Sequence, residues 1–280
     1  MVYALLLSFT NFDGLSGNWS WVGWQNYTTA LHDPLVWASL RRTGLYAVIV
    51  VPLSLAGGLA FAVLLNQRIR AVGVFRTIFY LPSVVPIVAT ALMFKLMFDR
   101  DTGLINGILS WFGIDAVSWL IDPHAFLILV LLSLWGLGGG MVVFLAGLQA
   151  IPAELLEAAS MDGAGPWRRF WHITLPLLSP MIFFQLVLSL IGTLQTLVQP
   201  LLMAPATGGN AGGAVDTGVP QGNHLYMVNV YAQFFSYQKF GYGAALLWIL
   251  FLVILAVTVL VMRSSARWVY YEVDQDGAEQ

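Results

Sequence analysis

Few residues of this chain could perform chemistry. The 280 residues include four His and no Cys. A nucleotide-binding P-loop needs a Lys that follows Gly and precedes Ser or Thr, but Lys95 and Lys239 stand in Phe-Lys-Leu and Gln-Lys-Phe. The histidines form no metal-ligand spacing, and no nucleophile–base set stands out. We therefore expect no catalytic residue, no metal and no cofactor, and no ATP binding of the P-loop type.

The segment 148–175 carries the clearest local signals. Pro152 suits the first turn of a helix, where its missing N–H costs nothing. Glu154 and Glu157 follow early in that helix, where the helix dipole favours negative charge. Gly163 comes directly after Asp162 and can adopt the left-handed conformation that ends a helix.

A second short helix is expected from Gly165-Pro166, stopping before Pro176. The segment would therefore be a short helix, a sharp turn and another short helix. Ala158 and Ala159 give the first helix a low profile that a partner's groove could approach closely. On capping signals alone, an ordinary surface helix explains the same pattern.

The composition defines the solvent in which these elements sit. Hydrophobic residues make up 59% of the chain and charged residues 9%, with a net charge of −2; an ordinary soluble domain is about 25% charged. This excludes a disordered chain and a nucleic-acid binder with a basic surface. A soluble enzyme is nearly excluded too, and an integral protein of the lipid bilayer remains.

Five segments are long and apolar enough to be spanning helices, each needing about 20 residues. They are approximately 43–65, 77–98, 125–147, 177–203 and 240–262. Residues 1–9 are apolar but under half a span, and we interpret them as the end of a partial first span. The expected fold is an all-α polytopic transmembrane helical bundle that forms a single domain over 1–280.

The orientation follows from the excess of Lys and Arg that cytoplasmic loops carry. Seven such residues lie in one set of loops and five in the other, counted along the sequence. This modest bias places 66–76, the segment 148–175 and the C-terminus in the cytoplasm.

The fourth predicted span has a polar stripe. At 100° per residue, its polar members fall on one side of the helix, and leucines and Phe183 occupy the other. The stripe consists of Gln185, Ser189, Gly192, Thr196 and Gln199. Polar groups cannot remain unpaired in hydrocarbon, so the stripe faces a solute path or another helix. Its neutral amides and hydroxyls suit sugar hydroxyls, but small polar residues also pack helices together.

The segment from Glu157 to Ala164, followed by Phe170, Ile173, Leu175-Pro176 and Pro180, resembles the EAA loop of ABC importer permeases. Four further stretches resemble the carbohydrate-uptake branch, of the maltose or glycerol-3-phosphate type. They are Ser8–Thr10, Val22–Tyr27, Phe75–Thr77 and Leu81–Pro86, and the resemblance covers about residues 5–265. Two departures stand out: the family has a complete first helix, and Thr207–Asn210 differs from its Thr-x-Gly-Gly-Pro pattern.

The resemblance implies a six-helix permease, here with a truncated first helix, in the bacterial cytoplasmic membrane. It implies two copies of an ABC ATPase subunit, a second permease subunit and an external solute-binding protein as partners, with a sugar-like solute moved by alternating access. The segment 148–175 would be the cytoplasmic coupling loop. Coupling to the ATPase would involve Glu157, Ala158, Ala159, Asp162 and Gly163.

Three alternatives stay open on the residues alone. A stand-alone secondary carrier or channel for a polar solute would need no ATPase, although the five spans hold no Asp, Glu or His in their interiors to bind a coupling ion. A membrane-embedded enzyme lacks a candidate site. A membrane scaffold would recruit a partner through residues 153–163 without moving any solute.

Overall fold

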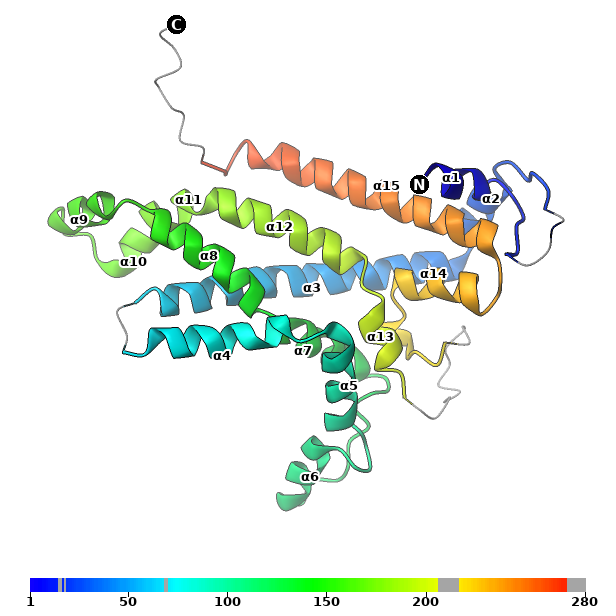
Figure 1. Cartoon of the computed structure of the whole chain (residues 1–280), viewed down its shortest axis with the longest axis horizontal. Helices are drawn as coiled ribbons and strands as arrows, with labels where there is room; N and C mark the ends of the chain where they lie inside the picture. Colours follow the sequence, from blue (N-terminus) through cyan, green and yellow to red (C-terminus); the bar gives the residue numbers. More distant parts are fainter. Residues whose placement is uncertain (15–16, 18, 68–69, 206–216, 271–280) are drawn as a thin grey trace, which may run out of the picture. The chain divides into compact units, whose positions relative to one another are not determined.

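The computed structural model describes residues 1–14, 17, 19–67, 70–205 and 217–270. Within these residues the regular elements are helical, apart from an isolated antiparallel bridge between Thr10 and Trp21. In chain order the elements are α1 (Val2–Leu7), α2 (Gln25–His32), α3 (Pro34–Leu65), α4 (Val72–Val84), α5 (Ile87–Met97), α6 (Leu104–Trp111), α7 (Ala125–Trp135), α8 (Gly138–Ala150), α9 (Ala153–Met161), α10 (Pro166–Arg169), η1 (Phe170–Thr174), α11 (Leu175–Leu177), α12 (Ser179–Leu194), α13 (Val198–Leu202), η2 (Gln221–Asn223), α14 (Tyr226–Phe235) and α15 (Phe240–Ser265) (Figure 1). Thr207–Asn210, which differ from the family's Thr-x-Gly-Gly-Pro pattern, lie outside the residues that the structure describes.

The chain divides into two compact units. The first comprises Met1–Val50, Val84–Trp135 and Leu190–Ala256. The second comprises Val51–Ser83, Gly136–Ser189 and Val257–Gln280. Helices α3, α12 and α15 each contribute residues to both units.

Among the described helices, α3 and α15 are long and apolar enough to cross a membrane on their own. Three helix pairs would each cross only as one interrupted span: α4 with α5, α7 with α8, and the helical run Pro166–Leu177 with α12. The count reaches five if each pair is one span. The first long helix starts at Pro34, well before the expected Thr43, so that Arg41 and Arg42 lie within it.

The prediction of one helix over 177–203 is wrong. Helix α12 ends at Leu194, and α13 begins only at Val198. Pro200 supplies the reason, because its ring would clash with the carbonyl of residue 196 in a continuous helix. In the first turn of a new helix the same proline is tolerated. The predicted span 77–98 is likewise interrupted, before the N-cap Pro86 of α5.

The first unit has its core around α5, α7 and α13, where Tyr46, Phe94 and Leu129 are buried. Helix α13 packs against both α5 and α7. Lys95 Nζ donates a hydrogen bond to the carbonyl of Ala204, just beyond α13. A cation at this place suits the negative end of the helix dipole.

A buried amide organises the loop that follows α5. Asn106 in α6 donates through Nδ2 to the carbonyls of Arg100, at 3.0 Å, and Val117, at 2.9 Å. Its Oδ1 accepts from the Val117 N–H, at 3.2 Å, and from Trp119 Nε1, at 2.9 Å. One side chain therefore replaces the backbone pairing that this loop lacks.

The N-terminal residues are held to α2 and to the start of α15. The amide of Asn26 donates to the carbonyls of Ser8 and Thr10, each at 2.8 Å. The N–H of Gly241 donates to the Phe12 carbonyl at 2.9 Å. A Cβ at Gly241 would lie 2.0 Å from the Thr10 carbonyl oxygen, so the close approach requires glycine.

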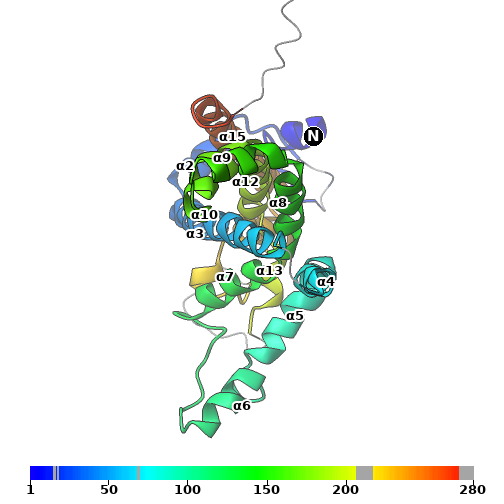
Figure 2. The same ribbon diagram turned by 90° about the vertical axis from the view of Figure 1, so that its left-hand side faces the viewer.

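The second unit has a separate core, in which Leu65, Met141, Phe144 and Leu178 are buried. The end of α3 lies beside α4, where Phe61 stacks on Phe79 at 4.7 Å between ring centroids (Figure 1). At the start of α8 a Cβ on Gly138 would lie 2.1 Å from the Phe79 carbonyl oxygen. Helices α9 and α10 lie together at one end of this unit (Figure 2).

His224 is a buried titratable group of the first unit, with 4% of its surface exposed. Its Nε2 has no hydrogen-bond partner among the described residues. Burial, reinforced by the positive charge of Arg42, lowers the pKa of His224 from 6.5 to about 4. The folded chain therefore holds this imidazole neutral at neutral pH.

This burial predicts acid sensitivity. Between pH values of about 4 and about 6.5 the unfolded chain binds the proton that folded His224 rejects, so the free energy of unfolding falls as the pH decreases through this range. Above it the contribution is constant. We expect His224→Gln to flatten the dependence of the thermal unfolding midpoint on pH in detergent. The exposed His32→Gln serves as the control, and an unchanged slope in His224→Gln would contradict the assignment.

Candidate functional site

Helix α9 has the predicted start and end. It begins after Pro152, with Glu154 in its first turn, and Asp162 is its C-cap. Gly163 has a φ of +75°. The N–H of Ala164 donates to the Ala159 carbonyl at 2.9 Å, and the N–H of Gly163 donates to the Ser160 carbonyl at 3.1 Å. These two bonds form a Schellman motif, so the predicted glycine cap is confirmed.

One face of α9 is open. Glu154, Glu157, Ala158 and Met161 are exposed, and Met161 has 89% of its surface accessible. These residues recur three or four positions apart and therefore share one side of the helix. An exposed methionine between carboxylates and a small alanine is an unusual surface for water and a suitable one for a partner protein. Ala159 is half-buried on the other side.

The second arm of the loop continues further than expected. Helix α10 gives way to a π-helical turn, Phe170–Thr174, and α11 then carries Pro176 as far as Leu177. The expected stop before Pro176 is wrong, because the π-turn changes the hydrogen-bond register ahead of the proline. Arg169 Nη1 donates to Ser160 Oγ at 2.5 Å and ties this arm to α9.

The polar stripe is divided by the break at residues 195–197. In the second unit, Gln185 faces the close approach between α12 and α8, since a Cβ on Gly140 would lie 3.2 Å from Gln185 Nε2. Ser189, one turn further along α12, is half-buried. Gln185 therefore fits a helix-packing role.

The remaining stripe residues lie in the first unit. Gly192 is exposed, and a Cβ there would meet nothing within 4 Å. Thr196 is buried and donates to the Gly192 carbonyl at 3.5 Å. Gln199 is half-buried but belongs to α13 rather than to the same helix. The single helical arc expected for all five residues is therefore not formed.

Thr196 instead joins a hydroxyl cluster that the sequence did not reveal. The hydroxyl of Tyr46 in α3 pairs with that of Ser133 in α7 and with Thr196. Tyr46 and Ser133 each lie in an apolar stretch and Thr196 belongs to the polar stripe, and only the tertiary structure brings the three together. Among the described residues no group of three potential metal ligands occurs. The polar chemistry of the cluster is neutral hydrogen bonding.

Comparison with known proteins gives the class of this fold. The chain resembles a chain of the crystal structure of a bacterial ABC transporter involved in the import of the acidic polysaccharide alginate, with a TM-score of 0.78. The two chains are 23% identical, and the match covers 95% of this chain and 88% of that one. The all-helical polytopic bundle is thus the fold of an ABC importer permease.

Sequence relatives define the family. The family model described as "Binding-protein-dependent transport system inner membrane component" matches residues 46–271. The probable ABC transporter permease protein YesP of Bacillus subtilis is 37% identical, over 96% of this chain and 85% of the relative. The trehalose/maltose transport system permease protein MalF of Thermococcus litoralis is 35% identical, over 86% of this chain and 79% of the relative.

The chain belongs to the family of binding-protein-dependent transport system inner membrane components. It is a multi-pass inner membrane protein and the permease subunit of an ABC importer, whose transport depends on a binding protein. ATP hydrolysis takes place in a separate subunit. Membership of this family selects the importer permease over the three alternatives, which were a stand-alone carrier or channel, a membrane-embedded enzyme and a membrane scaffold.

The cap of α9 leads to a paired test. Gly163→Ala forces a side chain into the left-handed region, at a cost of about 1 kcal/mol, whereas Gly165 has a φ of −65° and open space around it. We expect Gly163→Ala to speed hydrogen exchange at the Gly163 and Ala164 amides by about fivefold, while Gly165→Ala leaves it unchanged. Mass spectrometry of the peptide covering 153–166 would measure this, and equal exchange in both variants would argue against a strained cap.

Proposed function

We propose that this chain is one transmembrane subunit of an ABC importer for a sugar or sugar-like solute. Two copies of the ATPase, a second permease subunit and an external solute-binding protein complete the complex. Relatives named for trehalose/maltose and lactose transport support this solute class, at 35% and 32% identity.

The loop with α9 is proposed to lie in the cytoplasm, together with the C-terminus. The excess of Lys and Arg over 66–76, 148–175 and the C-terminal segment supports this orientation. Three crossings then separate α9 from the start of α3: α3 itself, α4 with α5, and α7 with α8. An odd number of crossings places Pro34 on the outer side.

The observation that carries the coupling role is the exposed face of α9 above a rigid turn. Glu157 makes no ion pair with any described residue, and Ala158 lets a partner's backbone approach closely. Asp162 and Gly163 fix the helix end, and Ala159 faces inward on the opposite side. A groove in the ATPase would place a cation against Glu157. Motion of the ATPase subunit would then reach the permease through this end of the loop.

The solute path is proposed to include Ser189, Gly192 and Thr196, with Gln185 and Gln199 as its flanks. Gly192 and the exposed Gln195 leave this side of the chain open at the break between α12 and α13. A break exposes backbone carbonyls, which membrane proteins tolerate only beside protein or a water-filled cavity. This supports a hydrated path at the break.

The coupling role predicts a specific loss. Glu157→Lys reverses the charge on the docking face, so we expect solute uptake to fall by at least about tenfold, as for truncation of one partner of a charge pair. Insertion and pairing with the second permease should remain. Radiolabelled sugar uptake into proteoliposomes containing the whole complex would measure this. Asp115→Lys makes the same charge change in a distant exposed loop and should leave uptake intact; normal uptake by Glu157→Lys would reject the docking role.

The solute path predicts a different loss. Gly192→Leu fits the fold, because its Cβ meets no neighbour and Leu favours helix. We expect the complex to assemble, whereas uptake is lost because the side chain obstructs the path. Gly107→Leu, at a glycine of α6 with equally open surroundings, is the control. Loss of assembly in Gly192→Leu would show that this face packs against another helix instead.

A further inference from the structure

Helix α2 presents three distinct sides. Ala30 is fully buried, and Asn26 and Tyr27 next to it are half-buried against the N-terminal residues. Gln25, Thr28, Thr29 and His32 are exposed and fall within an arc of about 100° at the pitch of an α-helix. The polar arc therefore points away from the body of the first unit.

An apolar flank runs beside this polar arc. Trp24, Leu31 and Trp37 are 68%, 56% and 54% exposed. The Trp37 indole N–H donates to the Leu31 carbonyl at 2.8 Å, which fixes its ring beside α2. Exposed tryptophans next to a span end suit the boundary between lipid and water. With this flank at the boundary, the polar arc faces the aqueous compartment.

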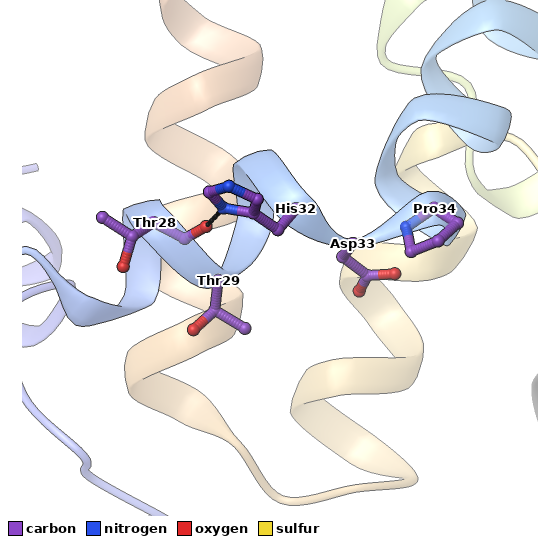
Figure 3. Close-up of a pocket in the computed structure, with 5 residues that line it drawn as sticks. All are labelled: Thr28, Thr29, His32, Asp33 and Pro34. Atoms are coloured by element: carbon purple, nitrogen blue, oxygen red, sulfur yellow. Dashed lines mark hydrogen bonds between the residues drawn. The ribbon is translucent and has the colours of Figure 1, made fainter.

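An open depression of about 660 Å³ lies along the end of the arc (Figure 3). Thr28, Thr29, His32, Asp33 and Pro34 line it. Thr29 and Asp33, one helical turn apart, extend to the same side of the chain (Figure 3). The His32 ring is held by a hydrogen bond between Nδ1 and the Thr28 carbonyl, at 2.8 Å.

Asp33 is fixed in place but keeps its charge available. Its Oδ1 accepts from the Leu35 N–H at 2.8 Å, and its Oδ2 accepts from the Tyr242 hydroxyl at 3.1 Å. No described Lys or Arg forms an ion pair with it. Each carboxylate oxygen retains a further acceptor site. The depression thus carries two threonines, a histidine held by a hydrogen bond, and one negative charge without an ion-pair partner among the described residues.

We propose that the polar arc of α2 together with Asp33 is a docking surface for the external solute-binding protein, which places a Lys or Arg against Asp33. This rests on the proposed orientation, which puts the start of α3 on the outer side. The family membership requires such a protein to land on this side of the membrane. A polar surface with one unpaired charge suits a reversible contact, in which complementary charge guides encounter and sets register. A face meant only for lipid would not present four polar side chains and a carboxylate.

The test is the ATPase activity of the assembled complex in nanodiscs, titrated with the solute-binding protein that stimulates the wild type. Thr29→Arg introduces a bulky cation opposite the partner's cation, and we expect the half-saturating concentration to rise by about tenfold. Asp33→Asn removes the charge; its Oδ1 can still accept from the Leu35 N–H, and its Nδ2 can donate to the Tyr242 hydroxyl, so we expect a rise of about threefold. The maximal rate should stay unchanged in both variants.

Two exposed outer residues provide matched controls: Ser110→Arg in α6 and Asp115→Asn in the following loop. Neither should change the titration. An unchanged half-saturating concentration in both Thr29→Arg and Asp33→Asn would overturn the proposal. A lowered maximal rate at an unchanged half-saturating concentration would also overturn it, because docking affinity would then be unaffected.

A second measurement does not depend on how well the variants fold. The chain has no cysteine, so Thr29→Cys gives a single reactive thiol in this subunit. We expect a thiol-to-amine cross-linker of short reach to join it to the solute-binding protein, and Ser110→Cys to give no product. Cross-links only to lipid or to the second permease would reject the surface. If no binding protein stimulates the wild-type complex, the proposed import function fails as well.

Discussion

Backbone N–H and C=O groups cannot remain unpaired in hydrocarbon, and this constraint governs how the chain is built. It explains why every regular element of the described residues is helical. Interruptions of the helices have local causes, such as Pro86 before α5 and Pro200 after the end of α12. Freed backbone groups then need partners, and Lys95 supplies one for the Ala204 carbonyl.

Glycines have two different uses in this chain. Inside each unit, glycines such as Gly138 and Gly241 let backbones meet at distances that a Cβ would forbid. At the end of α9 the glycine has the opposite use: Gly163 has open space around it and is needed for its positive φ alone. Packing glycines fix the bundle, whereas the cap glycine shapes a surface that is free to meet a partner.

The site could be predicted from the sequence only where it depends on neighbours along the chain. The start, length and cap of α9 follow from Pro152, Glu154 and Gly163, because capping is local. The polar stripe depended on a continuous helix from 177 to 203, and Pro200 shows why that periodicity was misleading. A proline at position 200, inside the predicted helix 177–203, was the signal in the sequence that indicated a break. The grouping of Tyr46, Ser133 and Thr196 had no signal, since the three residues lie far apart in sequence.

The sequence by itself determined that this protein lies in a bilayer, that it is helical, and that residues 157–180 resemble the EAA loop of ABC importer permeases. These properties follow from composition and from contiguous motifs, which do not need the third dimension. Only the tertiary structure decided which polar residues face one another, that Gln185 packs against Gly140, and that α2 presents a polar side with Asp33 at its end. Such pairings depend on contacts between distant segments, and a period of 3.6 residues describes one helix without naming its neighbours.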